Sequence, residues 1–473
     1  MPTDPRGLRA DAPLLDAWLA FHEAAPTPMT IPGHKHRCDL VGDVVAGDVP
    51  LYAGLDTMKL TAGRLHQAQT RAAALWGVDL CRFSVGGSTH GNQALALAVG
   101  APGDQVVISR TLHRSMFLGL VLAGLQPVWV RPRVDPTTAL PTGVDAADLA
   151  VALDGSGDAA AVFVGDPSYV GTLGDVAALA EVTHARGIPL VVDAAWGPHF
   201  GFHPDLPPHA LARGADAIVT SAHKTLPAIS QAALILASSR RIDPARFEAA
   251  VEATATTSPS GAILASIDAA RALLERDGAE LLGEVIALVA TARQRLRDIP
   301  GLLVLDGPGL DPTRLVLVLP GTGADGNAVE SDLLAAGLPV ELADRDTLVA
   351  IVTLADTADT VNRLVDVLLA SLTRHHGPAR CLAPPGLWEI DPVVAVSPRT
   401  AFFAEREVVP LAAAVGRVSA ELLAPYPPGI PVLAPGEMVT ADVLAALFEA
   451  RDRGVRIAYA ADPSLLRLHV LAD

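Results

Sequence analysis

The residue type best suited to covalent chemistry in this sequence is a lysine in the short polar turn Ser221-Ala222-His223-Lys224-Thr225. The turn follows an apolar run, 217–220, that is typical of a buried strand. Asp193 ends another such run, 189–192, so we expect both side chains at neighbouring strand ends. A lysine amine condenses with an aldehyde and an aspartate holds a pyridine nitrogen protonated, which is what pyridoxal phosphate needs. The alternative for Lys224 is an ordinary solvated surface lysine.

Three further turns carry groups that suit the same cofactor. Gly86-Gly87-Ser88-Thr89-His90 separates a strand-like run from a helical segment. Glycines, hydroxyls and helix amides suit a phosphate there, although serine and threonine are also common helix caps. His113 follows the next run and either stacks on a pyridine ring or caps a helix. The turn 166–172 ends a later run with a proline and hydroxyls, which fits a site rim or an ordinary turn.

Asp193 is followed by Ala194-Ala195-Trp196-Gly197, a small residue that fits under a ring and an aromatic residue that can border a substrate. An unpaired aspartate at the end of a buried strand is costly, so a cationic partner is expected. A protonated pyridine nitrogen is such a partner, and the charge-assisted hydrogen bond keeps the ring electron-poor.

These turns need a scaffold, and the segment from about 56 to 300 alternates short apolar runs with helical segments. This pattern predicts an α/β fold with a mostly parallel sheet and helices on both faces. Ligands of such sheets bind at the carboxyl ends of the strands, where every motif named above is expected. Seven runs are expected to form the sheet: 82–85, 105–108, 127–130, 160–164, 190–192, 217–219 and 233–236. Helices are expected at 92–99, 114–123 and 175–186.

The remaining segments are predicted to form an arm and two smaller domains. Residues 1–55 form an N-terminal arm with a helix at 14–24 and little core of its own. The large domain is expected at 56–300, a small α/β domain at 301–376 and a C-terminal domain at 377–473. Further elements are expected in these domains: a long helix at 258–297, strands at 302–305, 314–318 and 348–352, and a helix at 410–423.

Composition excludes several classes of partner. The chain has 473 residues, enough for two or three domains, and a net charge of −17 without a lysine- and arginine-rich run, which argues against nucleic acid or an anionic membrane. No segment has the apolar length of a signal peptide core or a membrane span, so a cytoplasmic enzyme is expected. The three cysteines lack paired spacing, and His34, His36 and Cys38 lack the spacing and fourth ligand of a zinc site, so no metal is expected.

Together these motifs resemble the ornithine/lysine/arginine decarboxylase family of fold type I pyridoxal-phosphate enzymes. The resemblance covers about residues 30 to 440. It rests on PGHKH (32–36), GGSTHGN (86–92), RTLHRS (110–115), DPSYVG (166–171), DAAWGPHFGFHP (193–204), SAHKTLPAISQAA (221–233), SPRTAFF (397–403), GRVSAE (416–421) and PYPPGIPVLAPGE (425–437).

The resemblance implies roles for individual residues. Lys224 would form the Schiff base with pyridoxal phosphate, Asp193 would pair with the ring nitrogen, and His113 and Ala195 would sandwich the ring. The phosphate would be held by Gly87, Ser88, Thr89, Ser221 and His223. Trp196 would border the substrate, while His34, Lys35 and the PYPPGIP tail would close the site, partly across a homodimer with shared active sites and possibly higher order.

The activity implied is decarboxylation of arginine, lysine or ornithine to the amine and carbon dioxide, a step in polyamine formation. Ala194 and Thr111 stand where many members carry an acid and an asparagine, and the segment before PGHK is too short for a receiver-like wing. Another fold type I activity is the alternative: an aminotransferase with Arg399 or Arg417 gripping the substrate carboxylate, an oxidase-like enzyme or a retro-aldol lyase. A further alternative is a catalytically inactive regulatory homologue. The sequence identifies neither the preferred amino acid nor the acid that would bind its side-chain cation.

Overall fold

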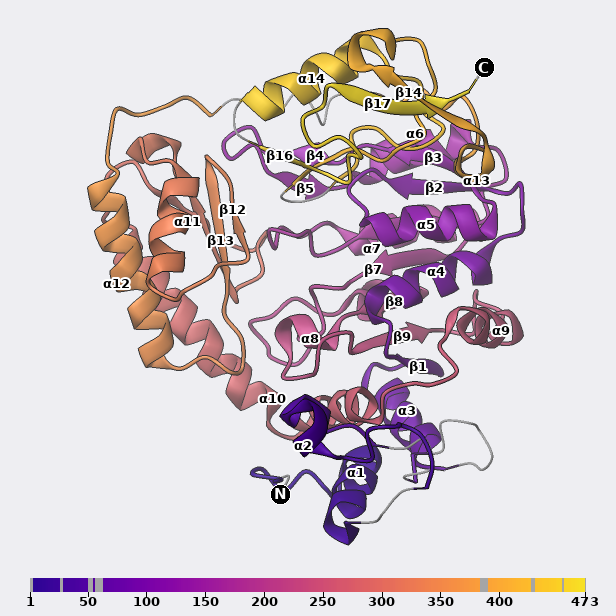
Figure 1. Ribbon diagram of the computed structural model, residues 1–473, viewed down its shortest axis with the longest axis vertical. Helices are drawn as coiled ribbons and strands as arrows, with labels where there is room; N and C mark the ends of the chain where they lie inside the picture. Colours follow the sequence, from indigo (N-terminus) through magenta and orange to yellow (C-terminus); the bar gives the residue numbers. More distant parts are fainter. Residues whose placement is uncertain are drawn as a thin grey trace.

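A seven-stranded sheet lies at the centre of the computed structural model, which describes residues 3–25, 29–49, 54–55, 63–382, 390–426, 430–452 and 455–472 (Figure 1). Its strand order is β1-β9-β8-β7-β6-β2-β3, with parallel pairing from β8 to β3, while β9 runs antiparallel to both β1 and β8. All seven predicted runs are therefore confirmed. The strands are β1 Leu80–Ser84, β2 Gln105–Ser109, β3 Gln126–Val130, β6 Val162–Gly165, β7 Leu190–Asp193, β8 Ala217–Thr220 and β9 Ala233–Ala237.

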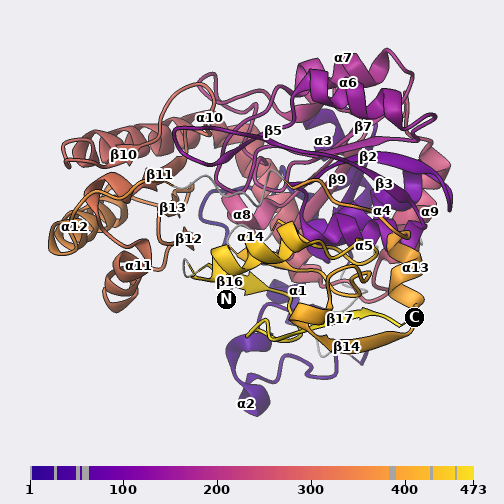
Figure 2. The ribbon, with the colours of Figure 1, turned by 90° about the horizontal axis from the view of Figure 1, so that it is seen from above.

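Helices cover both faces of this sheet because the strand residues are apolar on both sides. Leu190 and Val192 of β7 pack into one hydrophobic cluster and Val191 packs into the other, as the two-residue period of a strand requires. One face is covered by α4 Gly87–Val99, α5 Arg114–Ala123 and α9 Pro244–Thr254. The other is covered by α3 Arg64–Leu75, α6 Ala146–Gly155, α7 Val176–His184 and part of α10 Gly261–Leu296 (Figure 2). The three helices predicted between the strands are confirmed, although α4 begins five residues earlier than expected.

The 36-residue helix α10 connects the large sheet to a second, four-stranded sheet (Figure 1). This sheet is antiparallel throughout, in the order β10-β11-β13-β12, and α11 Gly326–Ala335 and α12 Ala358–Arg374 pack with it around one apolar cluster. Its strands are β10 Leu303–Val304, β11 Arg314–Val318, β12 Leu342–Ala343 and β13 Thr347–Ile351. The long helix and three of these strands were predicted, whereas the two-residue β12 was not.

The C-terminal segment contains one wrong prediction. Residues 410–423 do not form a helix: Leu411–Ala413 makes a single 3-10 turn with Ala414 as its C-cap, and Gly416 then adopts φ +82, a left-handed conformation that does not continue a helix. The chain then runs extended, with Ser419 paired to Val470 and Leu423 to Leu433. Apolar residues of this stretch pack into a small C-terminal core, but they do so from an extended chain held by β-bridges and not from one face of a helix.

Short elements complete the C-terminal segment and the arm. The C-terminal segment has α13 Pro398–Phe403, α14 Ala441–Asp452, β14 Arg406–Pro410 paired with β17 Arg467–Leu471, and β15 Ala424–Tyr426 paired with β16 Arg456–Ala458. The arm has the predicted helix as α1 Pro13–Ala24, then α2 Cys38–Val41, and it packs on α10, where Asp268 accepts a hydrogen bond from the backbone N–H of Leu14. Two short elements lie within the segment of the large domain: the hairpin of β4 Arg133–Val134 with β5 Pro141–Gly143, and the helix α8 Ala222–Thr225. In the described part of the chain, no helix combines the length and apolar character of a membrane span.

Candidate active site

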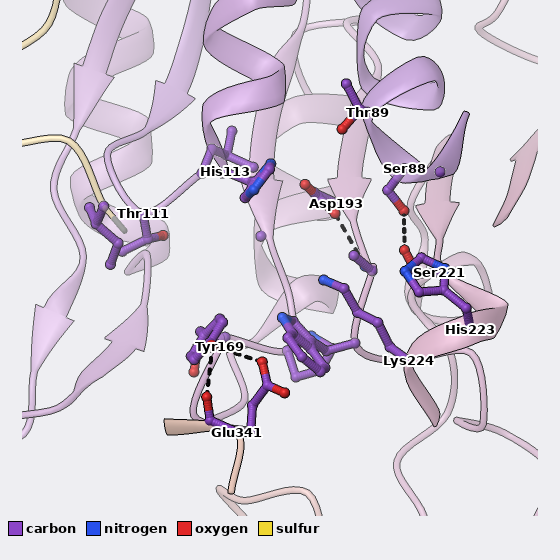
Figure 3. Close-up of a pocket in the computed structure, with 18 of the residues that line it drawn as sticks. Ser88, Thr89, Thr111, His113, Tyr169, Asp193, Ser221, His223, Lys224 and Glu341 are labelled. Atoms are coloured by element: carbon purple, nitrogen blue, oxygen red, sulfur yellow. Dashed lines mark hydrogen bonds between the residues drawn. The ribbon is translucent and has the colours of Figure 1, made fainter. Parts of the chain in front are cut away.

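A cavity of about 770 Å³ opens at the carboxyl ends of the parallel strands, where the sequence placed its polar turns. The turns that follow β1, β2, β6, β7 and β8 all contribute to its wall, and the small sheet closes one side (Figure 3). Of the predicted residues, the structure brings to this wall Gly87, Ser88, Thr89, His113, Asp193, Ala195, Trp196, Ser221, His223 and Lys224.

Lys224 stands in α8, immediately after β8, and its Nζ lies 3.9 Å from the centre of the Trp196 ring. Burial lowers the pKa of Lys224 from its ordinary value to about 8, since a buried ammonium loses hydration. The negative charges of Asp193 and Glu341 oppose this shift, while the positive charge of Arg314 adds to it. About a tenth of the amine is therefore uncharged at pH 7, far more than for an ordinary lysine, and this form is able to attack an aldehyde.

Asp193 ends β7 and points into the cavity, and it is only 8% exposed. One carboxylate oxygen accepts a hydrogen bond from Asn92 Nδ2 at 2.7 Å and the other from the backbone N–H of Ala195 at 3.2 Å. Within the described residues no arginine or lysine forms an ion pair with this carboxylate. A nearly buried, oriented aspartate without a cation fits the protonated nitrogen of a pyridine ring.

His113 caps the N-terminus of α5, where its Nδ1 accepts a hydrogen bond from the backbone N–H of Ser115. Burial lowers the pKa of His113, and the nearby charges of Lys224 and Arg114 lower it further against the effect of Asp193. The imidazole is therefore neutral at pH 7, with its proton on Nε2. A neutral ring at the cavity wall can stack on a planar cofactor without adding charge there.

Hydroxyls and amides converge at the N-terminus of α4. Gly87 has φ +67, which a residue with a side chain rarely adopts, and its N–H donates to the carbonyl of Gln231 at 2.8 Å. The N-cap residue is Gly86, which has no side chain to bond the other amides of the first turn. Ser88 Oγ and Ser221 Oγ lie 2.6 Å apart, so the two strand ends meet at this point. His223 Nδ1 donates to the carbonyl of Ala232 at 2.8 Å, which fixes the orientation of the imidazole ring. This arrangement fits a phosphate group.

Two site residues, Asn92 and Glu341, were given no role from the sequence. Asn92, one turn into α4, orients Asp193 and also donates to Ser115 Oγ at 2.8 Å. Glu341 comes from the small sheet, just before β12, and its Oε1 accepts a hydrogen bond from the Tyr169 hydroxyl at 2.7 Å (Figure 3). Asp193 and Glu341 are the two acids among the described lining residues. Tyr169 belongs to the singled-out DPSYVG turn, but nothing local in the sequence marks Glu341.

Other predicted residues lie away from this cavity. The structure places neither His34 nor Lys35 at the cavity of its own chain: Lys35 Nζ donates to the carbonyl of Thr30, and His34 Nε2 lies 3.3 Å from Asp48. Arg399 binds backbone carbonyls of α5, and Arg417 binds Glu407, so neither can grip a substrate here. In the described ranges no three His, Cys, Asp or Glu side chains are grouped as metal ligands.

Comparison with known proteins decides the family. The family model for the Orn/Lys/Arg decarboxylase major domain matches residues 12–307, and the model for the Orn/Lys/Arg decarboxylase C-terminal domain matches residues 387–453. The chain belongs to the Orn/Lys/Arg decarboxylase family. The protein is accordingly a pyridoxal-phosphate-dependent decarboxylase, and the groups at Lys224, Asp193 and the α4 N-terminus fit that cofactor.

Relatives of this decarboxylase match along nearly its whole length. "Arginine decarboxylase" of Halalkalibacterium halodurans is 32% identical, and "Arginine decarboxylase" of Bacillus subtilis is 30% identical, each over 98% of both chains. The solved structure of the Escherichia coli constitutive lysine decarboxylase superposes with a TM-score of 0.82 at 22% identity, covering 98% of this chain and 82% of that one. Sphingomonas wittichii serine palmitoyltransferase gives 0.57 at 15% identity, covering 78% of this chain and 85% of that one. The large domain therefore has the fold type I architecture.

Proposed function

We propose that this decarboxylase converts a basic L-amino acid, arginine first, into the corresponding amine and carbon dioxide. The observation that carries the proposal is the meeting of Lys224 and Asp193 in one cavity beside the N-terminus of α4, whose N-cap residue is a glycine. The relatives that are 30–32% identical over 98% of both chains are named arginine decarboxylases, which puts arginine ahead of lysine and ornithine. We also propose a cytoplasmic location and a contribution of the product amine to polyamine formation.

Each lining residue has a proposed task with respect to the cofactor. With the cofactor bound, Lys224 would hold pyridoxal phosphate covalently, Asp193 would bind its ring nitrogen, and His113 and Ala195 would contact its ring. Its phosphate would be bound by Gly87, Ser88, Thr89, Ser221 and His223. The cofactor, when bound, supplies an electron sink for the charge left on the α-carbon as carbon dioxide departs.

The chain's own residues perform the remaining tasks. The Asp193 carboxylate, fixed by Asn92, keeps a proton on the nitrogen that faces it. Lys224, with a pKa of about 8, is able to give a proton from Nζ to the α-carbon at neutral pH. Trp196 is only 8% exposed and excludes water from one side of the cavity. A poorly hydrated cavity favours neutral carbon dioxide over the charged carboxylate of the substrate.

Glu341 is proposed to bind the substrate's side-chain cation. Among the described residues that line the cavity, the acids are Asp193 and Glu341, and Asp193 is assigned to the cofactor. The Tyr169 hydroxyl donates a hydrogen bond that holds the Glu341 carboxylate in place. No arginine belongs to the described lining, so nothing there holds an α-carboxylate in a bidentate fork. An unanchored carboxylate and an anchored distal cation favour decarboxylation over transamination.

A homodimer with shared active sites is proposed from the arm. Its stretch around His34 and Lys35 exposes large apolar side chains: Met29 92%, Ile31 53%, Leu40 66%, Val41 59% and Val44 86%. A second copy would cover them and receive His34 and Lys35 at its own cavity. Of the tail, Ile430 lines the cavity, while 427–429 lie outside the described residues.

Mixed dimers test the shared site. Lys224→Ala and the double variant His34→Ala/Lys35→Ala, each inactive alone, should regain part of the wild-type activity when they are unfolded and reassembled together. A mixture that stays inactive while both parents are dimeric would show that the arm does not complete a partner's site.

Product analysis tests the proposed activity. The purified protein with added pyridoxal phosphate is incubated with arginine, lysine and ornithine in turn, and carbon dioxide, amine and keto acid are measured. We expect equal amounts of carbon dioxide and amine, with the highest kcat/KM for arginine. Keto acid without carbon dioxide would replace the proposal with a transaminase.

A further inference from the structure

A group of charged side chains is buried directly behind the cavity wall and has no part in the mechanism given above. It consists of Arg314, the first residue of β11 in the small sheet, Asp311 in the turn before that strand, and His199 of the large domain. Asp311 and Arg314 are 0% exposed and His199 is 1% exposed. Charges are rarely buried this completely unless they are paired or have a task in the protein.

Hydrogen bonds connect this group to the turn that carries Lys224. Asp311 Oδ1 lies 3.2 Å from His199 Nε2, so that nitrogen carries a proton toward the carboxylate. His199 Nδ1 lies 3.0 Å from the hydroxyl of Thr225, the residue after Lys224 and the last of α8. Burial by itself would raise the pKa of Asp311, but His199 and Arg314 hold it below its usual value. Asp311 is therefore a permanent anion that orients His199 and, through it, Thr225.

Arg314 supports the other side of the same wall. Its Cζ lies 4.5 Å from the centre of the Trp196 ring, against which Lys224 Nζ also lies at 3.9 Å. The Nε atom of Arg314 lies 3.4 Å from Asp311 Oδ2. Within the described structure, none of the three guanidinium nitrogens of Arg314 makes a hydrogen bond. A Cβ added to Gly171 would come within 2.6 Å of Arg314 Cγ, so the DPSYVG turn rests directly on this side chain.

We propose that Arg314, Asp311 and His199 are positioning residues for Lys224, acting through Thr225 on one side and through Trp196 on the other. The packing of the small sheet against the large one then fixes the place of the amine, because Arg314 begins β11 and Asp311 lies in the turn just before that strand. The proposal rests on the proposed function in one respect: Lys224 is taken as the residue that holds the cofactor.

Arg314 also influences the charge of Lys224. Asp193 at the end of β7 and Glu341 before β12 favour the ammonium form, His113 of α5 is neutral, and His223 is the neighbour within α8. Arg314 on β11 is the positive charge that opposes the two carboxylates. Replacing it with an uncharged side chain therefore raises the pKa of Lys224 and lowers the fraction of free amine at a given pH.

Amine labelling measures this effect without substrate. The chain has three lysines, Lys35, Lys59 and Lys224, so labelling by trinitrobenzenesulfonate is readily resolved by peptide mass spectrometry. In the full chain freed of cofactor, the rate at Lys224 should rise with pH around a midpoint of about 8. Arg314→Met should move the midpoint up by about half a pH unit, which is about a twofold lower rate at pH 8. Arg314→Lys should leave the midpoint unchanged, and the rate at Lys35 serves as the internal control.

A matched pair at Thr225 tests the mechanical link in the loaded enzyme. Thr225→Val removes the hydroxyl that meets His199 at nearly constant volume, and Thr225→Ser keeps it. We expect Thr225→Val to lower kcat about tenfold with KM changed less than twofold, and Thr225→Ser to retain wild-type kcat.

An unchanged Lys224 midpoint in Arg314→Met, or wild-type kcat in Thr225→Val, overturns the proposal. If Arg314→Met fails to fold, the Thr225 pair decides alone. A wild-type protein that releases carbon dioxide from none of the three amino acids would refute the proposed function instead, and the labelling result would still stand.

Discussion

Replacing Glu341 with glutamine tests how the cavity distinguishes a cationic substrate. The change keeps the size of the side chain and its hydrogen bond with Tyr169, and it removes the negative charge. Hydrogen bonds to charged groups contribute about 1.5–3 kcal/mol. Glu341 is exposed, however, so solvent screening reduces the expected loss to about 1–2 kcal/mol. This corresponds to about a 5- to 30-fold decrease in kcat/KM for arginine.

The assay compares arginine with citrulline, in which a neutral ureido group replaces the guanidinium. Wild-type protein should prefer arginine, and Glu341→Gln should lose most of that preference because citrulline gains nothing from the carboxylate. Tyr169→Phe is the matched control, since it removes the supporting hydroxyl and leaves the charge, and it should keep the greater part of the preference. If Glu341→Gln discriminates between the two amino acids as well as the wild type does, the cation is bound elsewhere.

Three further perturbations follow from the geometry. Asp193→Asn should keep the fold, by circular dichroism, yet lower kcat at least about a hundredfold, a loss of about 2.7 kcal/mol or more at ~1.4 kcal/mol per tenfold; wild-type turnover would contradict the role of the carboxylate. Arg110→Met leaves Glu437, its bidentate partner at 2.5 and 2.8 Å, buried and unpaired, and should destabilise the protein by about 3–5 kcal/mol in denaturant unfolding. Adding Glu437→Gln should restore part of that loss, and an additive double variant would argue against the pairing. Cofactor capture by the apoprotein should slow as pH falls through about 8, because Lys224 gains its proton there, and a pH-independent rate would contradict its lowered pKa.

The predicted residues that line the cavity share one physical origin. Each stands at the carboxyl end of a strand in a parallel sheet, and the topology brings such ends to one edge. The apolar runs before Asp193 and Lys224 therefore predicted both the strands and the meeting of the turns, which the structure shows in one cavity. The family motifs added the identity of the cofactor but no geometry.

Glu341 and Arg314 could not be predicted in the same way. Their position depends on how α10 packs the small sheet against the large one, and no local pattern encodes that packing. The wrong helix at 410–423 has a related cause. Its apolar spacing fits a helical period, but Gly416 adopts a left-handed conformation that breaks it, and Leu423 pairs with Leu433 instead. The proposed position of His34 and Lys35 depends on a second chain.

Borohydride trapping tests the central claim most directly. The protein is incubated with pyridoxal phosphate, reduced, digested and mapped by mass spectrometry, with the three lysines as the possible sites. The account predicts one stable phosphopyridoxyl group, on Lys224, with loss of all decarboxylase activity in proportion to its formation. A group on Lys35 or Lys59, or full activity after complete modification of Lys224, would contradict it.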